Sequence, residues 1–570
     1  MRLSISKSKN STSLYVIKST YKNGVRSSEV VEKLGTVKEL SKKLKGQDPI
    51  EWAEKYIEEL NRQEKEGNRE IIVKYSPTKV IVKDEQRSFN GGYLFLQQIY
   101  YGLRLNKLCA EITKKYKFSF NLNSILSRLL YARIIYPSSK LATFQLSTKF
   151  IEQPDFELQH IYRALEIIAK EVDFIQSFLY KNSLRISKRN TGLLYYDCTN
   201  YFFEIEQEEG LKQYGPSKEH KPNPIVQMGL FMDGDGIPLA FNINKGNTNE
   251  QLTLKPLEKK ILSDFDLSRF VVCTDAGLAS HDNRMFNNKG ERAFITTQSI
   301  KTLKKHLKKW ALDSKGWSLA DDNKTFDITK LDDKKDKDKV FYKERWIKEN
   351  GLEQKIVVTY SIKYRDYQGN IRKSQIERAQ KLIDKNPGKL KRYGLNDYKR
   401  FINKSHCTAD GEVAEHDLYS INTELISKEA AFDGFYAVCT NLEDDASAII
   451  RVNKRRWEIE ECFRIMKSEF KARPVSLSRD DRIEAHFMTC FIALVIYRLL
   501  EKKLKDKYTC HEIIDGLRGM NFLEAKAGGY IPTYTRTDFT DDLHEAFGFR
   551  TDYEIVNTRK MKSIFKSTKS

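Results

Sequence analysis

The spacing of apolar side chains changes several times along the chain, and each change predicts a different kind of element. Residues 14–18 and 25–34 alternate apolar with polar side chains, which is the two-residue period of a half-buried strand. Turn residues at 22–24 join them as a hairpin, and residues 50–63 have the spacing of a helix. We therefore expect a hairpin-plus-helix unit over residues 1–80.

A helical pattern occupies residues 85–189. Apolar side chains recur every three or four residues there, most clearly in 92–101 and 125–135. From residue 190 onwards, short apolar runs bounded by turn residues predict strands instead. They lie at 193–203, 225–232, 237–244, 269–274 and 293–297. The second and third runs flank a glycine-rich turn and are expected to pair antiparallel, so that residues 190–300 form the first part of an α/β domain.

The composition becomes strongly charged over residues 301–433. Strand patterns at 340–346 and 354–364 and a helical pattern at 372–383 lie within it, and we interpret the segment as a mainly-β insertion.

The α/β domain resumes over residues 434–500 with an apolar strand at 434–440. Residues 453–467 contain neither glycine nor proline and alternate charged with large apolar side chains, which predicts one long helix. The apolar run at 487–497 is too short to span a bilayer and predicts a buried helix. Residues 501–570 carry no motif that indicates a function.

The charge balance favours a polyanionic partner. Lysine and arginine total 99 against 78 acidic residues, a net charge of +21, and each phosphate that a cation neutralises releases condensed counterions. Lysine-rich proteins from AT-rich genomes share this balance, so charge alone leaves both readings open. With 40% hydrophobic residues, the 570-residue chain has enough apolar surface for several folded modules. The N-terminal unit is interpreted as a DNA-contacting or docking module.

Several classes of chemistry lack their signatures. The 8 cysteines contain no Cys-x-x-Cys pair, which argues against zinc knuckles and disulfides and fits a reducing cytoplasm. No glycine-rich phosphate loop indicates ATP use, and no serine or cysteine lies in a nucleophile motif. His220 lies in a proline-rich segment and is read as a surface loop residue.

Two carboxylates stand out because of the strands that contain them. Asp197 interrupts a buried run, where a charged group is costly unless it binds a cation or a hydrogen-bond donor. Asp275 ends an apolar strand and is expected to project into the cleft at the strand tips. The alternative for Asp197 is an acid that caps a turn.

The predicted helix at 453–467 offers a third carboxylate. At about 100° per residue, one stripe holds Asn453, Arg456, Glu460 and Lys467. Glu461 points about a quarter-turn away. A carboxylate between a guanidinium and an ammonium suits a metal ion and the phosphates of nucleic acid, whereas a solvated face with ordinary salt bridges is the alternative.

The order of arginine, three residues, glutamate, six residues and lysine resembles the glutamate-bearing helix of DDE transposases from bacterial insertion sequences, the group with the Tyr-Arg-Glu-Lys signature. Asn453 stands where that group has its tyrosine. The segments at Asp197 and Asp275 resemble the group's first two acidic motifs, and the order of strands resembles a ribonuclease-H-like fold. The resemblance implies a ribonuclease-H-like catalytic core interrupted by a large insertion and preceded by a helical DNA-binding region.

The resemblance also implies a metal-dependent site. Two Mg²⁺ ions, with Mn²⁺ as a substitute, are expected to be held by Asp197 bridging both, Asp275 on one and Glu460 on the other. Arg456, Lys467 and Asn453 are expected to contact phosphates. The enzyme would cleave DNA at the ends of its element and join the freed 3′-hydroxyl to target DNA.

The insertion of relatives helps to hold DNA ends, sometimes with an aromatic side chain against an unstacked base. The candidates for such stacking are Trp346, Trp317 and Trp310, and a core position is the alternative for each. The expected partner is double-stranded DNA, both terminal inverted repeats and target, bound by a homodimer in the bacterial cytoplasm and not at a membrane. Two rivals remain: a DNA-binding derivative that no longer cuts, and a ribonuclease-H-like nuclease without strand transfer.

Overall fold

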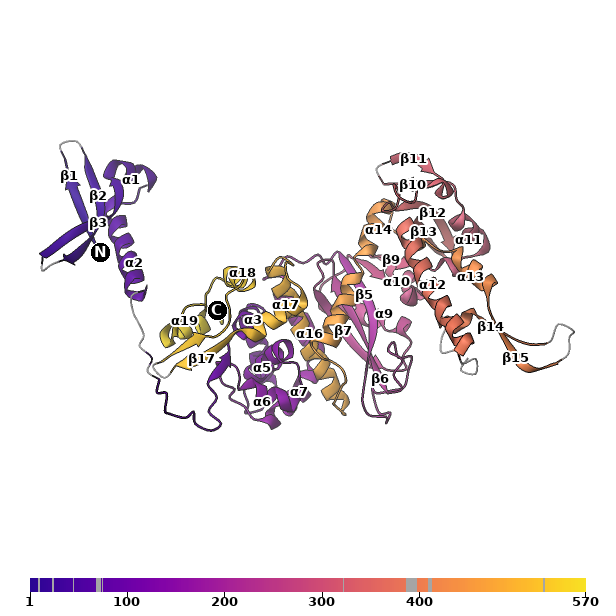
Figure 1. Ribbon diagram of the computed structural model, residues 1–570, viewed down its shortest axis with the longest axis horizontal. Helices are drawn as coiled ribbons and strands as arrows, with labels where there is room; N and C mark the ends of the chain where they lie inside the picture. The colour runs from indigo at the N-terminus through magenta and orange to yellow at the C-terminus, as the bar shows by residue number, and fades with distance from the viewer. Residues whose placement is uncertain are drawn as a thin grey trace. The chain divides into compact units, whose positions relative to one another are not determined.

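Figure 1 shows the computed structural model of the chain. It describes residues 1–8, 11–22, 25–44, 46–67, 73, 75–320, 322–385, 397–407, 413–525 and 528–570. The chain divides into two compact units, Met1–Glu85 with Glu524–Tyr530, and Gln86–Leu523 with Ile531–Ser570. The boundaries predicted at 189, 300, 433 and 500 fall inside the second unit and stay predictions.

The N-terminal unit is a three-stranded antiparallel sheet packed against two helices. In order these are β1 (Arg2–Lys7), β2 (Thr12–Lys22), β3 (Val25–Thr36), α1 (Val37–Lys43) and α2 (Pro49–Gly67). Leu14 of β2 is fully buried and packs with Leu40 of α1 and Ala53 of α2. The sequence predicted β2, β3 and α2 but not β1, whose only apolar side chains are Leu3 and Ile5 and which needs β2 as a partner.

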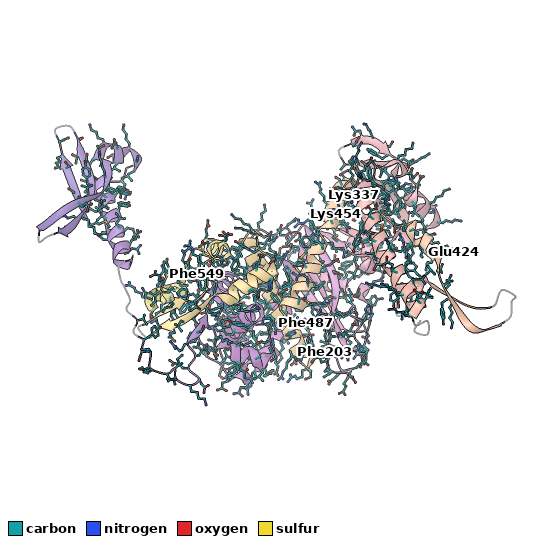
Figure 2. The ribbon with its side chains drawn as sticks, in the orientation of Figure 1. Phe203, Lys337, Glu424, Lys454, Phe487 and Phe549 are labelled. Carbon is teal, nitrogen blue, oxygen red and sulfur yellow. The ribbon has the colours of Figure 1, made fainter. Side chains whose placement is uncertain are left out.

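The predicted helical region is present in the second unit. After β4 (Ser88–Asn90) come α3 (Tyr93–Gly102), α4 (Leu105–Lys115), α5 (Leu122–Ile135), α6 (Lys140–Ser147), α7 (Leu158–Lys170) and α8 (Val172–Ser183). Helices α3, α5 and α7 pack against α16 (Asp480–Lys503). Helix α16 is long and apolar enough to cross a membrane, yet 94% of its apolar window is buried, as expected for the core helix that the sequence predicted. Its Phe487, labelled in Figure 2, lies 4.8 Å from Tyr201 between ring centroids.

A ten-stranded mixed sheet organises the second unit. Its order is β11-β10-β12-β13-β16-β9-β8-β5-β6-β7. The strands are β5 (Leu193–Phe202), β6 (Ile225–Asp233), β7 (Pro238–Lys245), β8 (Val271–Thr274), β9 (Ala293–Thr297), β10 (Trp317–Leu319), β11 (Asp322–Phe326), β12 (Phe341–Glu349), β13 (Leu352–Tyr360) and β16 (Phe435–Thr440). Strand β8 is parallel to β5 and β9, and the other pairs are antiparallel. Helix α9 (Leu254–Asp264) packs its buried leucines against this sheet, and α10 (His281–Asn287) lies between β8 and β9 in the chain. The α/β class is confirmed.

The insertion differs from the expectation of a mainly-β segment. Its described residues include α11 (Lys305–Leu312), the 24-residue α12 (Ile362–Lys385) and α13 (Thr423–Ala430), with β14 (Ile402–Cys407) and β15 (Val413–Ile421) as a separate hairpin. Strands β10 to β13 also extend the central sheet, because β13 pairs along its length with β16. The predicted helix at 372–383 lies within α12, which begins at Ile362, where the sequence pattern had predicted the end of a strand.

The single helix predicted over residues 453–467 is three consecutive pieces. They are α14 (Ala446–Lys454), α15 (Trp457–Arg464) and a π-helical turn, η6 (Ile465–Glu469). The Tyr195 hydroxyl donates to the Val452 carbonyl at 2.8 Å, and the Arg456 amide bonds to Asn453 instead, three residues back. The Val452 carbonyl also accepts from the Arg455 amide at 3.1 Å, so the four-residue hydrogen-bond pattern gives way to a three-residue one where Tyr195 binds.

The C-terminal region is folded, although it carries no motif that indicates a function. It consists of α17 (Cys510–Gly519), β17 (Asn521–Ala525), β18 (Gly529–Pro532), α18 (Asp538–Phe547), β19 (Val556–Asn557) and α19 (Thr558–Ser567). Phe522 of β17 pairs with Phe89 of β4, so that the beginning and the end of the second unit share a sheet.

Candidate active site

Asp197 and Asp275 come from neighbouring parallel strands. Strands β5 and β8 pair with Tyr195 opposite Cys273, so the same register two residues further on aligns the two acids. Asp275 directly follows β8, and its carboxylate accepts from the Leu278 amide at 3.1 Å, capping the short 3-10 helix Ala276–Leu278. The two predicted acids are therefore brought together at one level of the sheet.

The pKa of Asp197 shows how the two carboxylates interact. This pKa is raised from its ordinary value to about 6. Burial is the largest cause and the negative charge of Asp275 acts in the same direction, while Lys218 and Arg456 oppose the shift. The Cys198 amide donates to the Asp197 carboxylate at 2.8 Å. A buried acid beside another acid is a position where a cation relieves both the burial and the repulsion.

Two lysines lie beside Asp197. Lys467 donates to the Thr199 hydroxyl at 2.6 Å, and Thr199 is two residues from Asp197, on the same face of β5. Burial and the nearby charge of Lys218 lower the pKa of Lys467 to about 8, while Asp197 raises it. Lys218 contacts Glu250 at 3.1 Å and donates to the Cys198 carbonyl. The site therefore pairs its acids with concentrated positive charge.

Lys218 is a site residue that sequence reasoning missed. Lys218 lies in a loop and belongs to no motif. Its place in the proline-rich segment that precedes β6 was the only sequence feature that could have pointed to it. Burial opposes the charge of Lys218, yet Asp197 and Glu250 together raise its pKa. This coupling places the loop lysine in the electrostatic environment of Asp197.

Glu460 lies on α15 and is joined to the acids through Arg456. The Arg456 guanidinium is 3.5 Å from the Glu460 carboxylate, and its charge also acts on Asp197. The Glu460 side chain is 59% exposed, whereas Glu461 is bound by Arg464 at 2.5 Å. Glu460 and Glu461 thus differ in environment as the predicted helix register requires.

The predicted stripe is only partly preserved. Asn453, Arg456 and Glu460 line one cavity, whereas Lys467 reaches Thr199 on β5 after the π-helical turn. Asn453 is 8% exposed and donates to the Tyr436 hydroxyl at 3.0 Å. Its amide group is therefore engaged inside the protein, which is a poor position for the phosphate contact that the sequence predicted.

The cavity beside Glu460 has a volume of about 700 Å³ and a mixed aromatic and basic lining. Among its lining residues are Tyr364, Tyr367, Tyr436, Lys363, Lys454, Arg456 and Trp457. Trp457 and Tyr367 are each 60% exposed. Lys454, labelled in Figure 2, lies at the end of α14. Exposed rings next to cations are the side chains that bind nucleotides by stacking and charge.

The three tryptophans selected from the sequence do not line this cavity. Trp317 is completely buried, and the Lys343 ammonium lies 4.4 Å from its ring centroid, so it has no free face for a base and its assignment as a stacking residue was wrong. Trp310 packs against the same core. Trp346 is 44% exposed on β12 and remains a prediction. The exposed Trp457 was overlooked because it was read only as part of the signature.

The helix that carries Glu460 is fixed to the sheet by buried ion pairs. Glu458 accepts from Arg455 at 2.9 Å and faces Arg498 of α16 at 3.5 Å. Arg498 also donates to the Gly236 carbonyl at 2.7 Å, in the turn between β6 and β7. These contacts fix the start of α15 with respect to both α16 and the strands that carry the acids.

The chemistry of the acids fits a hard divalent cation, which prefers oxygen ligands. Asp197 and Asp275 provide such oxygens, and their repulsion favours a bound cation. Among the residues that the structure describes, no group of three or more acidic, histidine or cysteine side chains is arranged to hold a metal ion. Glu460 is therefore not gathered with the two aspartates into one ligand cluster.

Comparison with known proteins yields a partial family match. Residues 351–496 match the family model of the transposase DDE domain. This range contains Arg456, Glu460 and Lys467 and leaves Asp197 and Asp275 outside. No curated protein matches the chain.

Among solved structures, a cryo-EM structure of a piggyBac transposase synaptic complex with hairpin DNA aligns with 85% of this chain and 88% of its own, at 8% identity and a TM-score of 0.36. A TM-score of this size does not establish a common fold.

Proposed function

We propose that this protein is a DDE transposase that cleaves DNA at the terminal inverted repeats of its element and joins the 3′-hydroxyl ends to target DNA. The family match over residues 351–496 supports a transposase with DDE-type chemistry. The observation that carries the proposal is the alignment of Asp197 with Asp275 on the neighbouring strands β5 and β8, beside the arginine that contacts Glu460.

The residues proposed to hold the metal are Asp197, Asp275 and Glu460. DDE transposase domains are generally dependent on divalent metal, and Mg²⁺, with Mn²⁺ as a substitute, fits the oxygen donors of this chain. When bound, such ions activate an attacking oxygen and stabilise a leaving oxygen. Glu460 has the exposure and the flexible side chain to turn toward the aspartates.

Basic side chains of the site are proposed to hold the DNA backbone. Lys467 and Lys218 place two ammonium groups near Asp197, where the phosphate to be cleaved would lie. The positive charge of Arg456 acts on both Asp197 and Glu460. Arg456 therefore orients the Glu460 side chain and partly neutralises these two carboxylates before the substrate binds. No covalent intermediate with the protein is needed.

The strand order supports a ribonuclease-H-like core for this proposal. Strands β5, β6 and β7 form consecutive antiparallel pairs, and β8 and β9 lie parallel to β5 on its other side. Antiparallel pairing on one side of β5 and parallel pairing on the other support this part of the proposal.

The aromatic cavity next to Glu460 is proposed to receive an unstacked nucleotide of the DNA end. Its volume of about 700 Å³ is large enough for a nucleotide, and Trp457 and Tyr367 offer exposed rings. The protein is further proposed to bind double-stranded DNA as a homodimer in the bacterial cytoplasm.

The test is cleavage and joining of a labelled duplex that carries the repeat flanking the gene, with Mg²⁺, comparing wild type and Asp275→Asn. The variant removes a ligand charge without changing the volume, so it should bind the duplex and neither cut nor join it. Cutting by the variant would remove Asp275 from the site. Cutting without joining by wild type would favour the nuclease, and specific binding without either activity would favour the non-cutting DNA-binding protein.

A further inference from the structure

The N-terminal sheet has one face that, within the described part of its unit, the two helices do not cover. Leu14 and Val16 of β2 are fully buried toward α1 and α2. Because side chains alternate along a strand, Tyr15 between them points to the opposite face. The pairing of the strands then identifies the other side chains on that face, which we call the outer sheet face.

The outer sheet face combines basic, hydroxyl and a few apolar side chains. In register these include Arg2, Ser4, Ser6, Ser13, Tyr15, Ile17, Ser28, Val30 and Lys33, of which Val30 is 58% exposed. The Lys33 ammonium lies 6.0 Å from the Tyr15 ring centroid, and Arg2 donates to the Ser28 hydroxyl at 3.2 Å. These contacts confirm that both cations lie on the same side of the sheet as Tyr15.

The acidic residues of β3 are directed elsewhere. Glu32 lies opposite the buried Val16 and accepts from Tyr56 of α2 at 3.1 Å, so it belongs to the helix side. Glu29 lies opposite Lys18, an inward position in the same alternation. The helices themselves carry Glu39, Glu51 and Glu59, each with its own hydrogen-bond or ion-pair partner. The outer sheet face therefore carries cations and, among the described strand residues, no carboxylate, whereas the helix side carries both signs, with three lysines and one glutamate on α1.

We propose that the outer sheet face enters the major groove of duplex DNA. A strand pair fits that groove of B-form DNA, whereas the deep, narrow major groove of A-form RNA excludes it. Arginine and lysine bind phosphates or guanine, serine hydroxyls bond to any base edge, and an apolar group such as Ile17 packs on a thymine methyl. The inference rests on the proposed function only for DNA as the partner, and it adds a DNA-binding site outside the helical region.

The test compares two double variants of the full-length protein that remove the same charge. Arg2→Gln with Lys33→Gln alters the outer sheet face, and Lys38→Gln with Lys42→Gln alters exposed positions on α1. Binding to a short fluorescent B-form duplex of mixed sequence is measured by anisotropy over roughly 50 to 200 mM salt. The sheet-face variant should bind about tenfold more weakly, with the slope of log K against log salt reduced by about 1 to 2, while the α1 variant stays near wild type.

Equal losses of DNA affinity in the two double variants would overturn the inference. Unchanged affinity in both would overturn it too, and would favour a protein partner for this face. Ser4→Glu adds a negative charge to the same face and should also weaken DNA binding. This second variant, together with an unchanged thermal midpoint of the first, shows that a loss of binding is not caused by a folding defect. A wild-type protein that binds no duplex would refute the proposed function as well. Wild-type binding that none of the sheet-face changes weakens would refute this inference alone.

Discussion

Asp197 is held between opposing influences that define its chemistry. Burial and Asp275 favour its neutral form, and Lys218 and Arg456 favour its charged form. The result is a carboxyl group with a pKa of about 6, well above that of an ordinary aspartate. The ionised form of Asp197 is therefore destabilised in the metal-free protein, and a bound divalent cation would stabilise it.

The first prediction concerns stability. Because folding raises the pKa of Asp197, the folded protein retains a proton that the unfolded chain loses as pH rises from about 4 to about 6, so the free energy of unfolding falls over that window. In EDTA at pH 7.5, Asp197→Asn should raise the thermal midpoint, by a stabilisation of up to about 3 kcal/mol. The gain should vanish near pH 4.

Thermal unfolding at both pH values measures this effect. A midpoint that falls equally at pH 4 and pH 7.5 would mean that the carboxylate is stabilised by its neighbours rather than strained. Asp235→Asn, in the turn between β6 and β7, is a suitable control because it also removes one negative charge, but at a position away from Asp197 and Asp275.

The second prediction separates the adjacent glutamates. Glu460→Gln should reduce cleavage of the repeat duplex by about 100-fold or more, since a metal ligand contributes several kcal/mol of charge stabilisation. Glu461→Gln only breaks the partly exposed pair with Arg464 and should leave cleavage near wild type. Single-turnover cleavage rates compare the two. The reverse pattern would place Glu461 in the site.

At the level of elements, α15 depends on contacts far from it in sequence. The Tyr195 hydroxyl of β5 donates a hydrogen bond to the Val452 carbonyl near the end of α14, and the separate helix α15 begins at Trp457. Arg498 then ties Glu458 to the turn at Gly236. Gly236 has a φ of 82°, and a side chain there would collide with both Arg498 and Glu458. The glutamate helix is thus positioned by a strand, a turn and a core helix together.

The third prediction tests this arrangement. Arg498→Met keeps the apolar packing of the side chain but leaves the 10%-exposed Glu458 with Arg455 alone. We expect a loss of about 2–3 kcal/mol in the free energy of unfolding, measured by denaturant titration, and slower cleavage. Arg464→Met breaks an exposed pair and should cost less than about 1 kcal/mol. Equal losses would assign no special role to the buried pair.

The sequence revealed elements with strong periodicity and missed those that depend on partners. Strands β5 to β9 and the buried α16 follow directly from their apolar runs. The break before Trp457 was not predictable, because it arises from a tyrosine hydroxyl more than two hundred residues away. The start of α12 was hidden by the strand pattern that runs into it, and β1 by having only two apolar side chains.

The site shows the same division. The positions of Asp197 and Asp275 on adjacent strands followed from strand patterns with an acid in or after them. Lys218 was missed because a loop carries no periodicity, and Trp317 was misassigned because composition does not tell a buried indole from an exposed one. Asn453 lost its expected contact because its amide group turns toward Tyr436.

For the whole molecule, the second unit joins its insertion to its catalytic strands through one continuous sheet. Strand β13 pairs with β16, and β16 pairs with β9, so the cavity at Glu460 is bounded by both parts. The DNA end proposed to occupy this cavity would therefore contact both the insertion and Glu460.

The fourth prediction concerns assembly. A homodimer on DNA should appear by light scattering as two chains with two repeat duplexes, and it should form with Asp275→Asn as well, because assembly needs end binding and not cleavage. A single chain on a single duplex, under conditions in which wild type joins ends, would contradict the proposed dimer.

Strand β16 has a consequence for the order in which the chain is made. It lies between β9, which ends at Thr297, and β13, and its own residues begin only at Phe435. Until the ribosome has released β16, the sheet exists as two halves whose edge strands have unpaired backbone groups. The two aspartates are synthesised long before the strand that joins the halves and before Glu460. A nascent chain therefore lacks Glu460, one of the three residues proposed to hold the metal, until most of its 570 residues have been made.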